Sequence, residues 1–164
     1  MSTHFLPPGI AMPDTQQHEV YAWERDFVEK RVGPEIMSRE ECRDLVVAAA
    51  AHLGLGTAPT VSFPVIQIAC KAIPSKNAIE IADWGRSKVT VLHEMAHFGS
   101  WRAVIRGEEP HGDTFVGCAI GLYAKFCGLD VKWLEEKAAM RRLRFVPNLK
   151  PNLGRISDFF PGEI

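Results

Sequence analysis

Two histidines and a glutamate in one short segment have the types and the spacing of a metal-dependent hydrolytic site. The segment is His93-Glu94-Met95-Ala96-His97, an H-E-x-x-H motif. On an α-helix, residues four apart share a face and lie about 6 Å apart along the axis. Both imidazoles can therefore place a nitrogen about 2.0–2.1 Å from one Zn²⁺ ion. Glu94 projects beside the ion, where it can hold and deprotonate a metal-bound water.

The motif alone is moderate evidence for a metal site, because a motif this short arises by chance in roughly one or two chains per hundred. A third ligand elsewhere in the sequence would strengthen it. Catalytic zinc sites usually have three protein ligands and one position open to water. His111 is the strongest candidate, since it lies where a second helical pattern begins, in Pro110-His111-Gly112-Asp113-Thr114-Phe115. Glu108, Glu109 and Asp113 are the alternatives. The two glutamates lie in a polar segment that is expected to be solvated, and Asp113 suits a helix cap or an acceptor that orients a ligand histidine.

The two blocks H-E-M-A-H and H-G-D-T-F resemble the motifs of the SprT-like (Spartan-like) zinc metallopeptidases. They also resemble small metallohydrolases of bacteria and bacteriophage. The resemblance covers about residues 60–128, including Ala78-Ile79-Glu80-Ile81-Ala82 as the strand before the zinc helix. It implies that His93, His97 and His111 bind zinc, that Glu94 is the general base and that a peptide bond is cleaved. Many SprT-like proteins add a cysteine-rich zinc ribbon, which this sequence does not contain, and this weakens the transfer of their DNA-repair role.

Three functions fit these residues. The first is a zinc metallopeptidase that acts on a protein or peptide substrate. The second is a zinc hydrolase of a non-protein amide, and the third is a non-catalytic module with a structural metal. Zn²⁺ is the expected cofactor, although imidazole also binds Mn²⁺ and Fe²⁺. Tyr21 and Tyr123 are the only tyrosines, and the sequence does not assign either of them to stabilising an oxyanion.

The residues around the motif predict the helices that the site requires. Ser87 can cap the zinc helix, whose apolar residues recur at near-helical spacing, and Gly99 is expected to end it. The segment from Gly99 to Pro110 is long enough to bring His111 back to that helix. Apolar residues from Phe115 to Phe126 predict the second helix, with Asp113 or Thr114 as its cap and Gly128 as its end.

The remaining segments predict an α+β fold, with a small antiparallel β-sheet packed on a helical core that includes a zincin-like HExxH helix. Pro64 indicates that the first strand-like run is broken or lies at a sheet edge. The other predicted elements are a helix at 15–32 ended by Gly33-Pro34, a helix from the capping box Ser38-Arg39-Glu40-Glu41 to Gly54, strand-like runs at 60–72 and 78–82 around a turn at 74–77, and a helix at 131–145 capped by Asp130.

Length and composition suggest one domain. The chain has 164 residues, of which 46% are apolar and 24% charged, as in ordinary globular proteins. We expect an irregular N-terminal segment at 1–14, a single zinc metallohydrolase domain at 15–146 and a C-terminal tail at 147–164. The net charge of −1 does not favour nucleic acid as a partner. A basic segment between Lys137 and Arg155 keeps nucleic acid as a weak alternative.

The sequence also suggests a compartment. No apolar run approaches the ~20 residues of a membrane span, and residues 1–13 do not have the pattern of a secretory signal. The four cysteines, Cys42, Cys70, Cys118 and Cys127, form no C-x-x-C pair and are expected to be reduced and mostly in the core. We therefore expect a cytoplasmic protein that does not act at a membrane.

Overall fold

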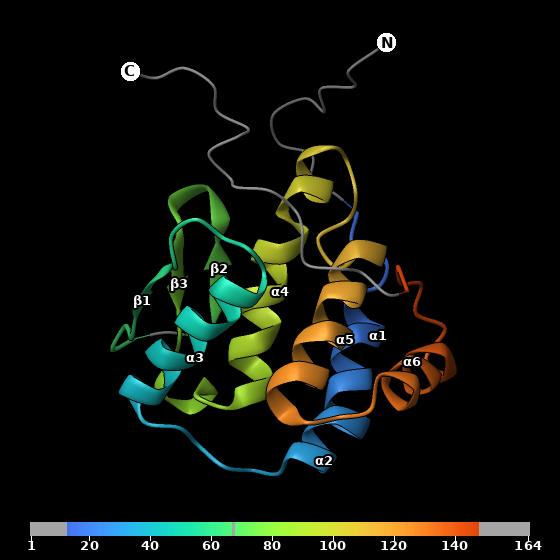
Figure 1. The fold of residues 1–164 in the computed structure, drawn as a ribbon, viewed down its shortest axis with the longest axis horizontal. Helices are drawn as coiled ribbons and strands as arrows, with labels where there is room; N and C mark the ends of the chain where they lie inside the picture. Colours follow the sequence, from blue (N-terminus) through green and yellow to red (C-terminus); the bar gives the residue numbers. More distant parts are fainter. Residues whose placement is uncertain (1–12, 67, 148–164) are drawn as a thin grey trace.

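The computed structural model describes residues 13–66 and 68–147, and helix α4 lies between α3 and α5 (Figure 1). The expected α+β class is confirmed. The elements are α1 (Gln17–Trp23), the π-helical turn η1 (Glu24–Val28), α2 (Glu29–Val32), α3 (Arg39–His52), β1 (Thr60–Ser62), β2 (Lys71–Ile73), the 3₁₀ turn η2 (Pro74–Lys76), β3 (Ala78–Glu80), the 3₁₀ turn η3 (Asp83–Gly85), α4 (Lys88–Ile105), α5 (Asp113–Cys127) and α6 (Val131–Met140).

Helix α4 carries the H-E-x-x-H motif and begins where the sequence predicts. The side chain of Ser87 accepts a hydrogen bond from the backbone N–H of Thr90 at 3.1 Å. The prediction that Gly99 ends this helix is wrong, because α4 continues to Ile105. A Cβ at Gly99 would lie 2.9 Å from Cys118 Sγ and 3.0 Å from Leu53 Cδ2. Glycine is present there because α4 approaches its neighbours closely, and not because the helix stops.

Helix α5 follows His111 and ends at Gly128, which adopts the left-handed conformation with φ of 67°. The prediction that Asp113 or Thr114 caps this helix is wrong, since Gly112 is the N-cap residue and offers no side-chain oxygen. Glu108 binds the first turn instead. Its carboxylate accepts hydrogen bonds from the backbone N–H of Thr114 and, at 2.9 Å, from the Thr114 hydroxyl. Glu108, which lies outside α5, therefore caps the helix, a role that the sequence suggested for Asp113 or Thr114.

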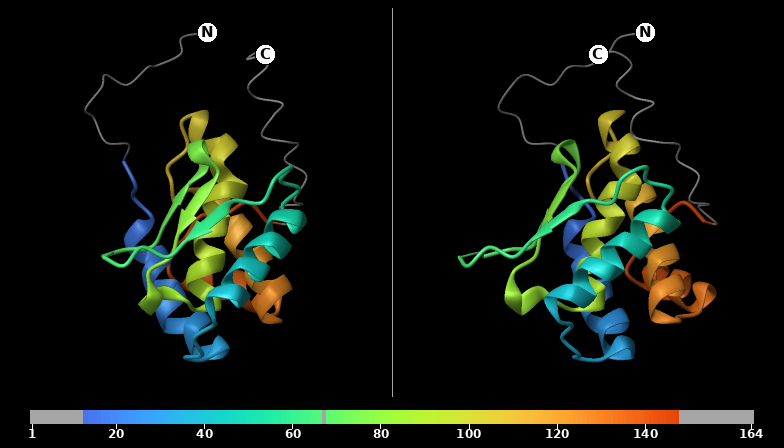
Figure 2. Two further views of the ribbon diagram at one scale, coloured as in Figure 1. Left: turned by 90° about the vertical axis from the view of Figure 1, so that its left-hand side faces the viewer. Right: turned by 60° about the vertical axis from the view of Figure 1, so that its left-hand side comes forward.

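The sheet has the strand order β1-β3-β2 and is mixed, whereas the sequence predicted an antiparallel sheet. Strand β2 pairs antiparallel with β3 through the predicted turn at 74–77, and β1 pairs parallel with β3. The run at 60–72 is broken after Ser62, as Pro64 indicated. The loop after β1 reverses the chain once and η2 reverses it again, so β1 and β3 point the same way. This loop projects away from the helices (Figure 2).

The N-terminal and C-terminal helices pack beside α4 and α5. The helix predicted at 15–32 forms as α1, η1 and α2, and its middle is a π-helical turn. Helix α3 begins with the predicted capping box at Ser38 and Glu41. Asp130 caps α6 as predicted, but α6 ends at Met140 and not near 145, because Arg142 turns the chain with φ of 56°. Trp23, Phe115 and Tyr123 are among the largest buried side chains of the core between these helices.

The four cysteines are free, as expected, with Cys42 and Cys118 buried and Cys70 and Cys127 partly exposed. Within 13–66 and 68–147, the helices lack the combination of length and apolar character that crossing a membrane requires. Most of the predicted N-terminal segment and of the C-terminal tail lies outside the described residues, as do the basic residues Lys150 and Arg155.

Candidate metal centre

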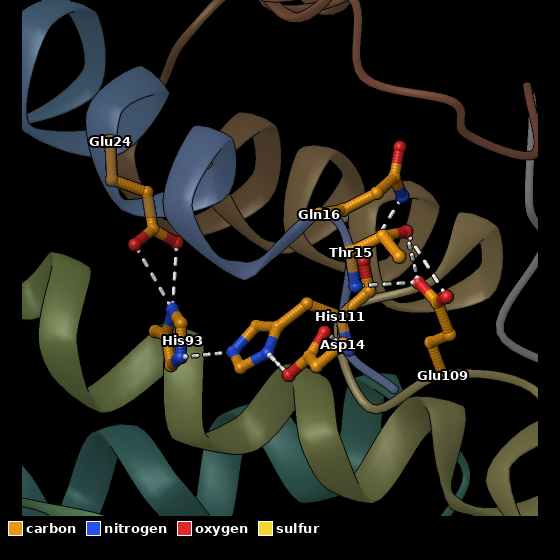
Figure 3. Close-up of polar contacts among 7 residues, drawn as sticks. All are labelled: Asp14, Thr15, Gln16, Glu24, His93, Glu109 and His111. Atoms are coloured by element: carbon orange, nitrogen blue, oxygen red, sulfur yellow. Dashed lines mark hydrogen bonds and ion pairs between the residues drawn. The ribbon is translucent and has the colours of Figure 1, made fainter. Parts of the chain in front are cut away.

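The three histidines singled out in the sequence converge on one point. His93 and His97 project from α4, and His111 projects from the loop before α5. One ligand atom from each lies within 4.8 Å of the others. The Nε2 atoms of His93 and His111 are 3.2 Å apart (Figure 3). Zinc ligands at 2.0–2.1 Å in a tetrahedron are separated by about 3.3 Å, so the three residues lie close enough to bind one metal ion.

Two carboxylates fix the orientation of two of these rings. His93 Nδ1 lies 2.8 Å from Glu24 Oε1, and His111 Nδ1 lies 2.7 Å from Asp14 Oδ2 (Figure 3). An ionised carboxylate only accepts hydrogen bonds, so each Nδ1 carries a proton and Nε2 is the ring nitrogen left to bind a metal. Asp14 also accepts a hydrogen bond from the backbone N–H of His111 at 3.2 Å. The two Nε2 atoms therefore face one another, as ligands of a shared cation do.

Glu24 lies on the helical turn η1 and is buried, with 4% of its surface exposed. It accepts a second hydrogen bond from the hydroxyl of Tyr123, at 2.6 Å. Glu24 was not among the residues predicted from the sequence, although a signal for it was present. Val20, Trp23 and Phe27 form the apolar face of this helix, and Glu24 follows Trp23 on that same face. An acidic residue on a buried face requires a partner, and here the partner is a candidate metal ligand.

Asp14 was also missed as a functional residue. It precedes α1, in the segment expected to be irregular, where no periodicity marks a residue as buried. Its contact with His111 spans 97 positions of the sequence. The role of orienting a ligand histidine, which the sequence suggested for Asp113, thus belongs to Asp14.

The alternative ligands have other partners. Glu108 binds Thr114, as described above. Glu109 accepts hydrogen bonds from the backbone N–H and the hydroxyl of Thr15, and Asp113 accepts one from Arg144 Nε at 3.2 Å. Among the residues that the structure describes, the candidate metal cluster consists of His93, His97 and His111.

The surroundings of the histidines set their pKa values in different directions. Burial, with the charges of His93 and His111, lowers the pKa of His97 well below its ordinary value. Burial also lowers the pKa of His111, although Asp14 opposes the shift. Burial acts on His93 in the same direction, but the charge and hydrogen bond of Glu24 outweigh it and raise the pKa of His93. Burial thus favours the neutral form of His97 and His111, which is the form that binds metals, and the carboxylate of Glu24 favours positive charge at His93. Such surroundings suit a metal cation.

Glu94 lies beside the histidines and is buried, with 7% of its surface exposed. Its Oε2 accepts a hydrogen bond from the backbone N–H of Ala72, at 2.7 Å, so strand β2 holds the carboxylate in place. Burial raises the pKa of Glu94. A carboxylate with a raised pKa is a better proton acceptor than one in water.

Tyr21 covers the exposed side of the cluster. Its ring stacks on that of His93, with centroids 5.3 Å apart and planes 14° from parallel. The ring of His111 lies 5.5 Å away. Tyr21 is 46% exposed, whereas Tyr123 is fully buried on the other side of Glu24. Of the two tyrosines, Tyr21 is therefore the one that faces solvent beside the candidate metal ligands.

A cavity of about 290 Å³ opens beside Glu94 and His97. Trp101 of α4 lines it, whereas Trp84, which precedes α4, is 62% exposed and does not. The lining residues are Tyr21, Cys70, Lys71, Ala72, Pro74, Glu94, His97, Trp101, Val104 and Pro110.

Comparison with family models, with curated proteins and with solved structures gave no match to this chain. Its function is therefore inferred from the chemistry of these residues and from the motif resemblance described above.

Proposed function

We propose that this protein is a zinc-dependent metallohydrolase, and specifically a metallopeptidase. One observation carries the proposal: His93, His97 and His111 bring their ligand atoms within 4.8 Å of one another, and Glu94 lies at a cavity beside them. Imidazole nitrogens are ordinary zinc ligands, and an adjacent carboxylate suits proton transfer. The resemblance of the two motif blocks to SprT-like zinc metallopeptidases supports zinc as the metal, a zincin-like arrangement and a peptide bond as the bond that is cleaved.

Zinc bound at these histidines would supply a Lewis acid that acidifies water and polarises a carbonyl. The chain's own residues supply the remaining chemistry. Asp14 and Glu24 hold two imidazole rings in orientation through their Nδ1 atoms. Glu94 accepts the proton of the attacking water and delivers it to the leaving nitrogen. Ala72 holds one oxygen of Glu94 in position during both transfers.

The cavity supports a catalytic role over a structural one. Structural zinc sites are closed by four protein ligands, whereas catalytic sites retain a position for water or substrate. The candidate cluster has three histidines within the described part of the chain, and His97 lines the cavity. A hydrolase of a non-protein amide would use the same residues, so a panel of peptides and small amides separates these two alternatives.

The substitution Glu94→Gln tests the proposal. It retains the size of the side chain and leaves the histidines unchanged, but it removes the proton acceptor. We expect the purified protein to bind about one zinc ion per chain, and Glu94→Gln to bind zinc equally while its cleavage of casein falls about 10²- to 10⁴-fold. Cleavage that persists in the variant, or that a chelator does not reduce, would contradict a zinc peptidase.

We further propose that the protein acts on a protein or peptide in a reducing compartment such as the cytoplasm. The four free cysteines support this proposal, because disulfides are rare where glutathione keeps thiols reduced. Measuring cleavage in reducing and in oxidising buffer tests it, and activity that requires an oxidant would contradict it.

A further inference from the structure

The cavity beside Glu94 runs along one face of α4. Four lining residues, Glu94, His97, Trp101 and Val104, follow at intervals of three or four positions, which keeps them on the same face of the helix. At 1.5 Å per residue, Trp101 lies about 6 Å beyond His97 along the axis, and Val104 about 10 Å beyond it. The cavity therefore extends away from the candidate metal ligands towards the C-terminal end of α4.

The lining residues of α4 that lie farthest from the motif, Trp101 and Val104, are apolar. The cavity is also lined by the apolar residues Pro74 of η2 and Pro110 of the loop before His111, and by Ala72 of β2, whose backbone N–H contacts Glu94. These residues come from separate parts of the sequence. A concave apolar surface next to a few convergent polar groups is the usual form of a ligand site.

Among the described residues, and apart from Glu94 and the candidate ligand His97, one charged side chain lines the cavity, and it is already paired. Lys71, a lining residue, forms an ion pair with Glu80 at 3.1 Å across the β2–β3 ladder. A charged substrate side chain that entered here would lose its hydration among proline, valine and tryptophan. An apolar side chain would instead transfer its surface from water to a protein wall, which is favourable.

We propose that this part of the cavity is a subsite for a bulky apolar side chain, carried by the residue that adjoins the scissile bond. Trp101 and Val104 are the residues that determine this specificity. The inference rests on the proposed hydrolase function, because it places the scissile bond at Glu94 and His97. An extended chain advances about 3.3 Å per residue, so the side chain of an adjoining residue reaches Trp101, about 6 Å along the helix from His97.

Binding of amino-acid hydroxamates to the zinc-loaded protein tests the subsite without requiring cleavage. The hydroxamate group binds zinc in each probe, and the probes differ only in the side chain, which is that of glycine, aspartate, leucine or phenylalanine. We expect isothermal titration calorimetry to show at least tenfold tighter binding of the leucine and phenylalanine probes than of the other two. Equal affinities for the four probes, or no binding to protein that elemental analysis shows to contain zinc, would overturn the subsite.

Substitutions assign the preference to the two residues. Trp101→Ala and Val104→Asn should each reduce the advantage of the phenylalanine probe over the glycine probe at least fivefold, while zinc content is retained. Trp84→Ala is the matched control, because it removes an exposed tryptophan that does not line the cavity. If one cavity variant does not fold, the other remains informative, since Val104 is only partly buried near the end of α4. A preference that survives in the folded variants would overturn the assignment.

The outcomes separate the two proposals. A side-chain preference without cleavage of any peptide would contradict the peptidase function and support the subsite. Cleavage of peptides regardless of the side chains that flank the bond would support the peptidase function and overturn the subsite.

Discussion

The Nδ1 atom of His93 lies 2.8 Å from Glu24, a residue 69 positions earlier in the sequence, and this contact turns Nε2 of His93 towards Nε2 of His111. Asp14 orients His111 in the same way, at 2.7 Å. The segment at 14–24 thus supplies both carboxylates that position candidate ligands, although none of the three histidines belongs to it. The candidate metal centre therefore depends on three separate parts of the chain: the segment at 14–24, α4 and the loop that carries His111. Its affinity for metal should change when any one of them is altered.

Replacing either of these carboxylates should weaken zinc binding. Glu24→Gln and Asp14→Asn remove the negative charge that holds an Nδ1 proton, and changes of this kind typically reduce metal affinity about 10- to 100-fold. Competition with a chromophoric chelator measures the effect. Asp113→Asn is the control, because the Asp113 carboxylate binds Arg144 and not a histidine. Unchanged affinity in both variants, or an equal loss in the control, would contradict the assigned roles.

The zinc-free protein should lose stability in mild acid. The pKa of His97 lies well below its ordinary value, since burial and the neighbouring histidines disfavour its charged form. Below pH ~6.5 the unfolded chain therefore binds a proton at His97 that the folded protein resists, and stability falls as pH decreases. The raised pKa of His93 acts in the opposite direction, because its contribution is present at low pH and is lost as pH rises through its folded pKa.

Comparing the wild type with His97→Gln isolates the contribution of His97. Chelator-treated samples are melted at pH 7.5 and at pH 5.5, and the loss of Tm between these two values should be smaller in the variant. A loss that is equal or larger in His97→Gln would show that another group controls the acid sensitivity.

Alanine should have opposite effects at two helical glycines. At Gly99 a Cβ would lie 2.9 Å from Cys118 Sγ and 3.0 Å from Leu53 Cδ2, both on buried side chains with little room to move. Such overpacking costs about 1–3 kcal/mol, against a gain of up to ~1 kcal/mol in helix propensity. At Gly121 of α5, a Cβ would meet nothing within 4 Å, so only the gain remains. Urea unfolding should show Gly99→Ala destabilised by about 1 kcal/mol and Gly121→Ala stabilised by about 0.5–1 kcal/mol. Stabilisation by both would contradict the close packing at Gly99.

Cys118 should be inert to thiol reagents in the folded protein. Burial raises the pKa of its thiol to about 12, so almost no thiolate is present at pH 8. Cys70 and Cys127 are partly exposed and should react first with a disulfide reagent. Cys118→Ala should therefore leave the number of rapidly reacting thiols unchanged under native conditions and reduce the total by one in denaturant. A decrease under native conditions would show that Cys118 is accessible.

The parts of the fold that were predictable depend on local chemistry. Ser38, Ser87 and Asp130 were predictable as helix caps because each lies directly before an apolar periodic segment. The spacing of His93 and His97 was equally informative, because residues four apart lie on the same face of a helix. The contacts that were not predictable are long-range. Gly99 resembles a helix end until its packing against Cys118 is known, and nothing near Asp14 in the sequence indicates that it meets His111. The direction of β1 depends on a loop whose course no residue pattern specifies.

Zinc titration of the wild type and of His111→Ala, by isothermal calorimetry at pH 7.5, tests the metal centre most directly. His111 is the one candidate ligand that lies outside α4, so the three-ligand site forms only if His111 binds the same ion as His93 and His97. We predict about one zinc ion per wild-type chain, and an affinity at least about a hundredfold weaker in the variant with its far-UV circular dichroism unchanged. A wild type that binds no zinc, or a folded His111→Ala variant that binds it equally well, would contradict a zinc site formed by the three histidines.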